Sequence, residues 1–254
     1  WRRAAAESLG HLGDPAGTPI AWARRLKDHP MLASKFNAEP RTRALLDVLR
    51  HSASVEGRLA LANPPDRAAN ALMDWYVKEG IHLLEWEVSE AYRAIEATED
   101  AALIAKVQDY LFGRPEGGGV VGWTSTSLKG RIKARLHALD EMLAAEVAND
   151  PARFLTGPRS ATRMLRALLA PALTQGNKRI WILLFDGMRL DTWTEVVRPI
   201  LQQHFTIYEP HPFFAFLPST THPARNSLLA GKLAKEWRGY DGRFTANEGI
   251  LGAI

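Results

Sequence analysis

The spacing of hydrophobic residues changes once along this chain of 254 residues, at Gly176. Before it, apolar side chains recur every three or four positions, which is typical of amphipathic helices. After it, Ile180-Trp-Ile-Leu-Leu-Phe185 forms a continuous apolar run that ends at Asp186-Gly187. A short run of this kind predicts a central parallel strand covered on both faces. The change therefore predicts a helical region over 1–175 and a sheet-containing α/β region over 176–254.

The helical region contains several amphipathic segments separated by glycine, proline or capping residues. Asp66 is a plausible N-cap, and Gly80 a plausible stop, for the second of them. A glycine-rich stretch over 113–119 is predicted to be a loop, and it lacks the Gly-Lys-Ser/Thr of a phosphate-binding loop. Helices are predicted over residues 43–59, 66–80, 81–95, 100–112, 128–147 and 159–173.

Beyond Asp186, helical and extended patterns alternate. A helix is predicted over 190–204 with a kink at Pro199, then a strand over 205–208. Residues 213–216 fit a third strand or a loop, and a helix is predicted from Pro223 to Ala230, closed by Gly231. Strands alternating with helices predict a parallel sheet. Ligands collect at the carboxyl ends of such strands, where Asp186 is expected.

Composition narrows the class of protein. The chain has no cysteine, which excludes disulfides and thiolate metal ligands. No apolar run approaches the roughly 20 residues that span a bilayer, and no basic-then-apolar leader opens the chain. A net charge of +4 is too mild to indicate nucleic-acid binding by itself. The start at Trp1 suggests a fragment of a longer protein, and we expect a bacterial-type cytoplasm and no membrane partner.

Two short segments carry groups that could perform chemistry. Asp186-Gly187 could be only the turn that ends a strand, or it could hold a carboxylate at the mouth of a sheet for a divalent cation. Ser219-Thr-Thr221 precedes a helix that is predicted to start at Pro223. These hydroxyls could simply cap that helix, or one could be a nucleophile beside the free N–H groups of its first turn.

Together these segments resemble the PglZ domain of the alkaline phosphatase superfamily. The resemblance rests on Asp-Gly-Met-Arg-Leu-Asp (186–191) after an apolar run and on Leu-Pro-Ser-Thr-Thr-His-Pro-Ala-Arg-Asn-Ser-Leu-Leu-Ala-Gly (217–231). It covers about residues 176–254, the first part of such a domain. It implies an α/β fold with an alkaline-phosphatase-like sheet and a metal-dependent phosphatase or phosphodiesterase activity.

The resemblance also assigns roles to individual residues. It implies two divalent metal ions, usually zinc and sometimes manganese, one of them bound by Asp186 and Ser219. Ser219 matches the nucleophile, and Thr220 is the alternative because three hydroxyls are adjacent. Arg225 and Asn226 match a pair that could hold a phosphoryl oxygen, although Arg225 could equally form a structural ion pair. The remaining metal ligands are expected outside this chain.

Two residues of the first motif and the histidines are predicted to have no catalytic role. Arg189 and Asp191 are interpreted as a structural pair near the end of the predicted strand. The histidines show no recognisable ligand spacing, although His222 could reach Ser219 as a base.

Three functions remain open at this point. The first is a hydrolase of a phage-defence system of the BREX type, acting with other proteins of the defence complex. The second is an inactive scaffold that docks those proteins through the apolar stripes of 81–95 and 128–147. The third, nucleic-acid binding, rests on the basic excess alone, although a phosphodiester substrate would make it partly true.

Overall fold

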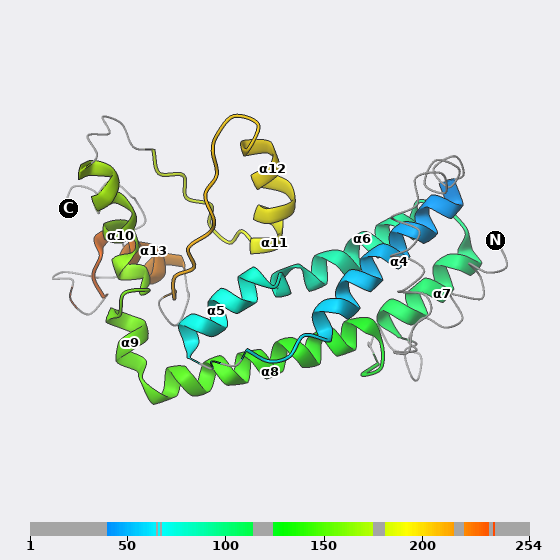
Figure 1. Cartoon of the computed structure of the whole chain (residues 1–254), viewed down its shortest axis with the longest axis horizontal. Coiled ribbons are helices and arrows are strands. Elements are labelled where there is room, and N and C mark those ends of the chain that lie inside the picture. Colours follow the sequence, from blue (N-terminus) through cyan, green and yellow to red (C-terminus); the bar gives the residue numbers. More distant parts are fainter. Residues whose placement is uncertain are drawn as a thin grey trace. The chain divides into compact units, whose positions relative to one another are not determined.

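A computed structural model describes residues 40–64, 66, 68–113, 124–174, 181–215, 221–233 and 236 (Figure 1). Internal contacts divide the chain into two compact units. The first unit comprises Trp1–Pro65 and Trp75–Glu141, and the second comprises Asp66–Asp74 and Met142–Ile254. The division falls inside two helices, α5 (Ala69–Lys78) and α8 (Leu128–Asn149). Each unit is described separately below.

The first unit is built from helices that share one apolar core. Its elements are α4 (Pro40–Leu59), the short 3-10 helix η1 (Ile81–Leu83), α6 (Leu84–Glu96), α7 (Ala101–Phe112) and the first part of α8. Helix α4 packs along α6, and α6 packs against α7 (Figure 1). The side chains that are fully or almost fully buried in this core are Val48, Val55, Leu84, Val88, Ala91, Ile95, Val107, Leu111, Leu128 and Ile132.

The apolar stripe predicted over 81–95 faces this core. Its members recur at helical spacing, so one face of α6 is apolar. Helices α4 and α7 both pack against α6. The side chains of Leu84 and Ile95 have no exposed surface. Leu84 and Ile95 are therefore part of the unit's own core, which removes these two residues from the docking surface that the scaffold hypothesis placed on this stripe.

Local signals in the sequence explain where the helices begin and end. The Asp100 side chain accepts a hydrogen bond of 3.1 Å from the backbone N–H of Leu103, which caps α7. Gly80 lies between α5 and η1 with φ 68°, a conformation that favours glycine. The predicted helices of this region are thus confirmed, with small shifts at their ends. The side chain of Asp66 accepts a hydrogen bond from the backbone N–H of Ala68, and α5 begins at Ala69.

A charged cluster connects α4 and α6 inside the first unit. Glu87 of α6 accepts hydrogen bonds of 2.9 Å from Ser54 Oγ and Arg58 Nη1 of α4, and its other oxygen contacts His51 Nδ1. The side chain of Glu87 is only 16% exposed. Burial alone would raise the pKa of Glu87, but the bonds from His51, Arg58 and Ser54 outweigh burial and lower this pKa to about 2.

A second ion pair joins α4 to α8. Arg131 donates to both carboxylate oxygens of Glu56, at 2.5 and 2.6 Å. This bidentate geometry is the strongest that a guanidinium and a carboxylate can adopt. The nearby hydroxyl of Tyr110 is buried, and burial together with the charge of Glu56 raises the pKa of Tyr110 to about 12. The polar groups at this interface are therefore held by partners on other helices.

The second unit contains shorter helices. They are α9 (Pro151–Thr156), α10 (Ala161–Thr174), α11 (Leu190–Thr192), the π-helical turn η2 (Trp193–Val197), α12 (Arg198–Leu201) and α13 (Thr221–Ala230). Helix α10 packs against α13 (Figure 1). α9 was not expected from the sequence, although Asp150 caps it and Pro151 occupies its first turn.

The turn between α9 and α10 is held by contacts from two distant segments. Phe214 forms an isolated parallel bridge with Ser160, and its ring meets that of Phe154 edge-on at a centroid distance of 4.6 Å. Arg159 donates to both oxygens of Asp74, at 2.6 and 2.8 Å. The aromatic contact and the ion pair together fix the entry into α10.

The predicted α/β sheet is wrong for the part of the chain that the structure describes. There, residues 181–185 belong to no strand, and residues 205–208 form none either. The side chains from Trp181 to Phe185 are between 47% and 84% exposed. A continuous apolar run is a local property, whereas a strand exists only where a neighbouring segment satisfies its backbone. Of the residues 213–216, Phe214 makes only the isolated bridge, and Phe216 lies outside the described residues.

The helix predicted over 190–204 ends at Leu201 and is irregular. Its middle, η2, is a π-helical turn that immediately precedes α12, whose second residue is Pro199. Proline has no N–H to donate to the preceding turn, so a regular α-helical ladder cannot continue through this position. At the place of the predicted kink, the structure has a π-helical turn directly before α12.

Among the helices of the described ranges, none is both long enough and apolar enough to cross a bilayer.

Candidate functional site

Asp186 lies in an exposed turn directly after the apolar segment 181–185. Its neighbour Gly187 has φ 68°, and no heavy atom lies within 4 Å of a Cβ placed there, so the backbone conformation alone favours glycine. The carboxylate of Asp186 is exposed and makes no hydrogen bond or ion pair with another described residue. Within the described part of the chain, no group therefore competes with a cation for this carboxylate.

Five residues after Asp186, Asp191 is buried, and its carboxylate accepts several hydrogen bonds. Its side chain is 4% exposed, and Arg189 donates to it from Nε at 3.0 Å and from Nη2 at 2.6 Å. The N–H of Thr192 adds a bond of 2.6 Å. Burial alone would raise the pKa of Asp191, but the bonds from Arg189 and Thr192 outweigh it and lower this pKa. The predicted structural pair of Arg189 and Asp191 is thus confirmed.

Helix α13 carries the second motif. It begins at Thr221, two residues before the predicted start at Pro223, and Gly231 ends it with φ 65°. Ser219 and Thr220, the predicted nucleophile and its alternative, lie outside the described residues. In the sequence they stand immediately before the first turn of α13, where helix N–H groups have no partner in the helix.

Arg225 and Asn226 both lie in α13, but in different surroundings. Asn226 and its neighbour Ser227 have no exposed surface, whereas Arg225 is half-buried. A side chain that is fully enclosed cannot meet a substrate from solvent in this structure. The arrangement therefore favours a positioning role for Asn226 within α13, and it leaves Arg225 as the member of the pair that a phosphoryl oxygen could reach.

A complete metal centre is not seen among the described residues, where no group of three or more histidine, aspartate and glutamate side chains is close enough to hold an ion. His204 and His211 are exposed. The side chain of His222 is not described. Asp186 contributes an oxygen ligand of the kind that divalent ions bind. The predicted ligand therefore has suitable chemistry, but the described residues place no further metal ligands in a group with it.

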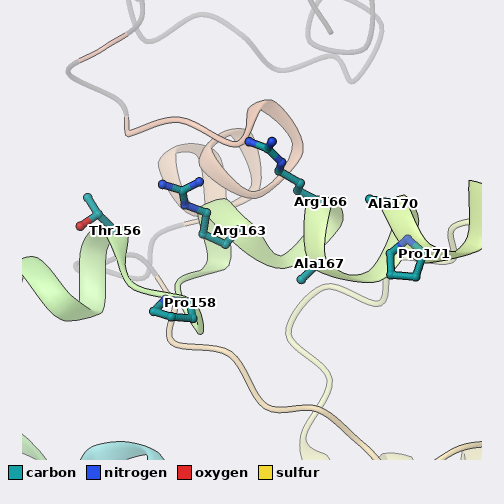
Figure 2. A pocket seen from close by; sticks show the side chains of 7 residues that line it. All are labelled: Thr156, Pro158, Arg163, Arg166, Ala167, Ala170 and Pro171. Atoms are coloured by element: carbon teal, nitrogen blue, oxygen red, sulfur yellow. The ribbon is translucent and has the colours of Figure 1, made fainter. Parts of the chain in front are cut away.

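Sequence reasoning missed a groove that lies along α9 and α10 of the second unit. It has a volume of about 550 Å³ and is lined by Thr156, Pro158, Arg163, Arg166, Ala167, Ala170 and Pro171 (Figure 2). A signal was present in the sequence, because residues 151–174 contain four arginines and no acidic residue. Such a run of uncompensated arginines on short helices indicates a basic surface.

Comparison with known proteins finds one family match, which lies within the second unit. Residues 164–241 match the family model described as the BREX system PglZ alkaline phosphatase-like domain. The matched stretch includes Asp186, the serine and threonine cluster and α13. The resemblance drawn from the two motifs is thereby confirmed, and the chain contains a PglZ alkaline phosphatase-like segment over these residues. No curated protein and no solved structure matched the chain.

Proposed function

We propose that the protein is a metal-dependent phosphoric ester hydrolase of the PglZ type. The observation that carries this proposal is the family match over 164–241, which contains both motifs in the predicted order. The exposed carboxylate of Asp186 and the helical start at Thr221 support it, because phosphoryl transfer depends on positioning and on neutralising charge.

Asp186 would hold one of two divalent ions, zinc or manganese, together with Ser219, and the remaining ligands would lie outside this chain. A bound divalent ion supplies positive charge that stabilises a deprotonated hydroxyl and a phosphoryl oxygen. Asp186 suits this role because it is exposed and makes no bond to another described residue.

Ser219 is proposed as the nucleophile, with Thr220 as the alternative. Its oxygen forms a bond to phosphorus while the ester bond to the leaving alcohol breaks, and the alcohol takes up a proton. Water then hydrolyses the phosphoserine and restores the hydroxyl. The N-terminus of α13 follows directly, and its positive dipole end and free N–H groups stabilise anionic oxygens there.

Within α13, Arg225 is proposed to bind a phosphoryl oxygen, since guanidinium groups recognise phosphate through two parallel hydrogen bonds. Asn226 is fully buried, so its proposed role is to hold α13 in position and not to contact the substrate.

We further propose a role in phage defence of the BREX type with partner proteins, and a phosphodiester such as nucleic acid as a substrate class. This part follows from the family alone.

The test is hydrolysis of bis(p-nitrophenyl) phosphate by the full-length protein with added zinc or manganese. Ser219→Ala and Asp186→Ala are each expected to lower kcat/KM by roughly a hundredfold or more. Ser89→Ala and Asp140→Ala, which alter an exposed hydroxyl and an exposed carboxylate on α6 and α8, serve as matched controls and should keep full activity.

The outcomes separate the assignments. Full activity of Ser219→Ala with loss in Thr220→Ala moves the nucleophile by one residue. Absence of turnover with either metal, in protein whose helical circular dichroism is intact, overturns the hydrolase proposal and leaves the scaffold as the better account.

A further inference from the structure

The α9–α10 groove combines positive charge with an apolar lining. Of the four arginines in residues 151–174, Arg159 is neutralised by Asp74. Arg163 and Arg166 have no ion-pair or hydrogen-bond partner among the described residues, and both are exposed. Their positive charges are therefore uncompensated in a stretch of chain that has no carboxylate of its own.

Arg163 and Arg166 line the groove from the same side of α10. They are three residues apart on α10, which places them on one face of the helix. Figure 2 shows both guanidinium groups extending from the same side of α10. A ligand with two negative charges spaced along its length could therefore pair with both.

The rest of the lining is unsuited to a highly polar ligand. Pro158, Ala167, Ala170 and Pro171 present only apolar side chains. The hydroxyl of Thr156 donates its proton to the carbonyl oxygen of Ala152 at 2.9 Å, so it cannot donate to an anion. A phosphate backbone would lose hydration against this surface without gaining hydrogen bonds beyond those of the two arginines.

We propose that this groove binds an acidic and apolar peptide segment of a partner protein. Leucine-type side chains of that segment lie against the alanines and prolines, and flanking carboxylates pair with Arg163 and Arg166. The groove has a volume of about 550 Å³ and is widely open to solvent, so a peptide segment can lie in it. Burial of apolar side chains supplies the affinity, and the arginines supply orientation.

This inference does not depend on the hydrolase proposal. Arg163, Thr156 and Pro158 lie outside the residues that match the family model, and none of the lining residues is among the proposed catalytic or metal-binding residues. Binding at the groove is measured without turnover, so either proposal can fail alone.

The experiment is fluorescence anisotropy of the labelled peptide EELLDELLEE with the full chain. Saturable binding is expected, and Arg163→Glu/Arg166→Glu should weaken it at least tenfold. The matched control Lys78→Glu/Lys106→Glu reverses the same number of exposed charges in the first unit and should change affinity less than twofold. Ala167→Gln, which narrows the groove with a good helix former and adds no charge, should weaken binding several-fold.

Two further probes test each half of the recognition. The neutral peptide QQLLNQLLQQ and the apolar-free peptide EESSDESSEE should both bind at least tenfold more weakly than the first. The proposal is overturned by absence of saturable binding in correctly folded protein, by equal loss in the lysine control, or by equal binding of either variant peptide. Tighter binding of a single-stranded oligonucleotide, lost on reversal of Arg163 and Arg166, would instead make the groove a phosphate site.

Discussion

The same kind of side chain has opposite surroundings in the two units of this protein. In the first, Ile95 is completely buried and belongs to α6, a helix that packs against α4 and α7. In the second, Ile182 belongs to an equally apolar run and is 51% exposed. Hydrophobicity along the sequence is similar in the two places. What differs is whether the described part of the chain supplies a surface to cover it.

The buried carboxylates of the two units differ in a parallel way. Glu87 receives hydrogen bonds from residues that are between 29 and 36 positions away, so its ion pairs connect two helices. Asp191 receives its bonds from residues one and two positions away. A pair of the first kind exists only in the folded unit, whereas a pair of the second kind can form in any turn. Non-local pairs therefore contribute more to the cooperativity of the unit that contains them.

The largest expected effect comes from matched truncations in the two units. Ile95→Ala should lower the free energy of unfolding of the first unit by about 3 kcal/mol, because a completely buried isoleucine leaves a cavity. Ile182→Ala removes the same atoms from an exposed position and should change stability by less than about 0.5 kcal/mol. Urea denaturation followed by circular dichroism measures both. Equal destabilisation by the two substitutions would break the comparison.

Removal of the charge of Glu87 should have the next largest effect. Glu87→Gln keeps the shape of the side chain but leaves Arg58 and His51 without their carboxylate, at a cost of about 2–3 kcal/mol. Glu141→Gln is the matched control, since Glu141 is 69% exposed and its ion pair among the described residues is with His137 on the same helix. Its effect should be within about 0.5 kcal/mol. Stability of Glu87→Gln equal to that of the control would show that the cluster is not stabilising.

The same carboxylate predicts how stability depends on pH. The pKa of Glu87 is about 2 in the folded protein against 4.5 for an ordinary glutamate. Its contribution is therefore complete above about pH 4.5 and is lost as the pH falls from there to about 2, by about 2 kcal/mol after allowance for screening by solvent. The difference in unfolding free energy between the parent and Glu87→Gln should shrink over this interval. A difference that stays constant down to pH 2 would contradict the assignment.

How far the fold could be predicted from the sequence depended on the range of the interactions. The helices over 43–112 and α8 followed from local periodicity and caps, because a helix satisfies its own backbone. The strand over 180–185 could not be judged in this way. Its pattern describes the side chains, but pairing with a distant segment decides whether a strand forms, and no such pairing is seen for the described residues 181–185.

The candidate site shows the same division. The motif residues predicted the family, because a short ordered pattern is a local property of the sequence, and the family match confirmed it. The burial of Asn226 could not be predicted, since it depends on how α13 packs. The arginines over 151–174 were visible in the sequence, but the α9–α10 groove was missed because its shape depends on how the two helices are arranged.

The smallest effect is expected at the local pair of the second unit. Asp191→Asn removes the charge that Arg189 and the N–H of Thr192 bind, at a cost of about 1 kcal/mol, because the side chain of Arg189 is 60% exposed and returns to water. Hydrogen exchange of the amides over 190–201 should accelerate about fivefold, while amides of α4 and α6 remain unchanged. Glu195→Gln, an exposed carboxylate in the same helical run, is the control and should leave exchange unaltered. Acceleration that spreads equally into the first unit would show that this pair is not local, and the contrast between the two carboxylates would fail.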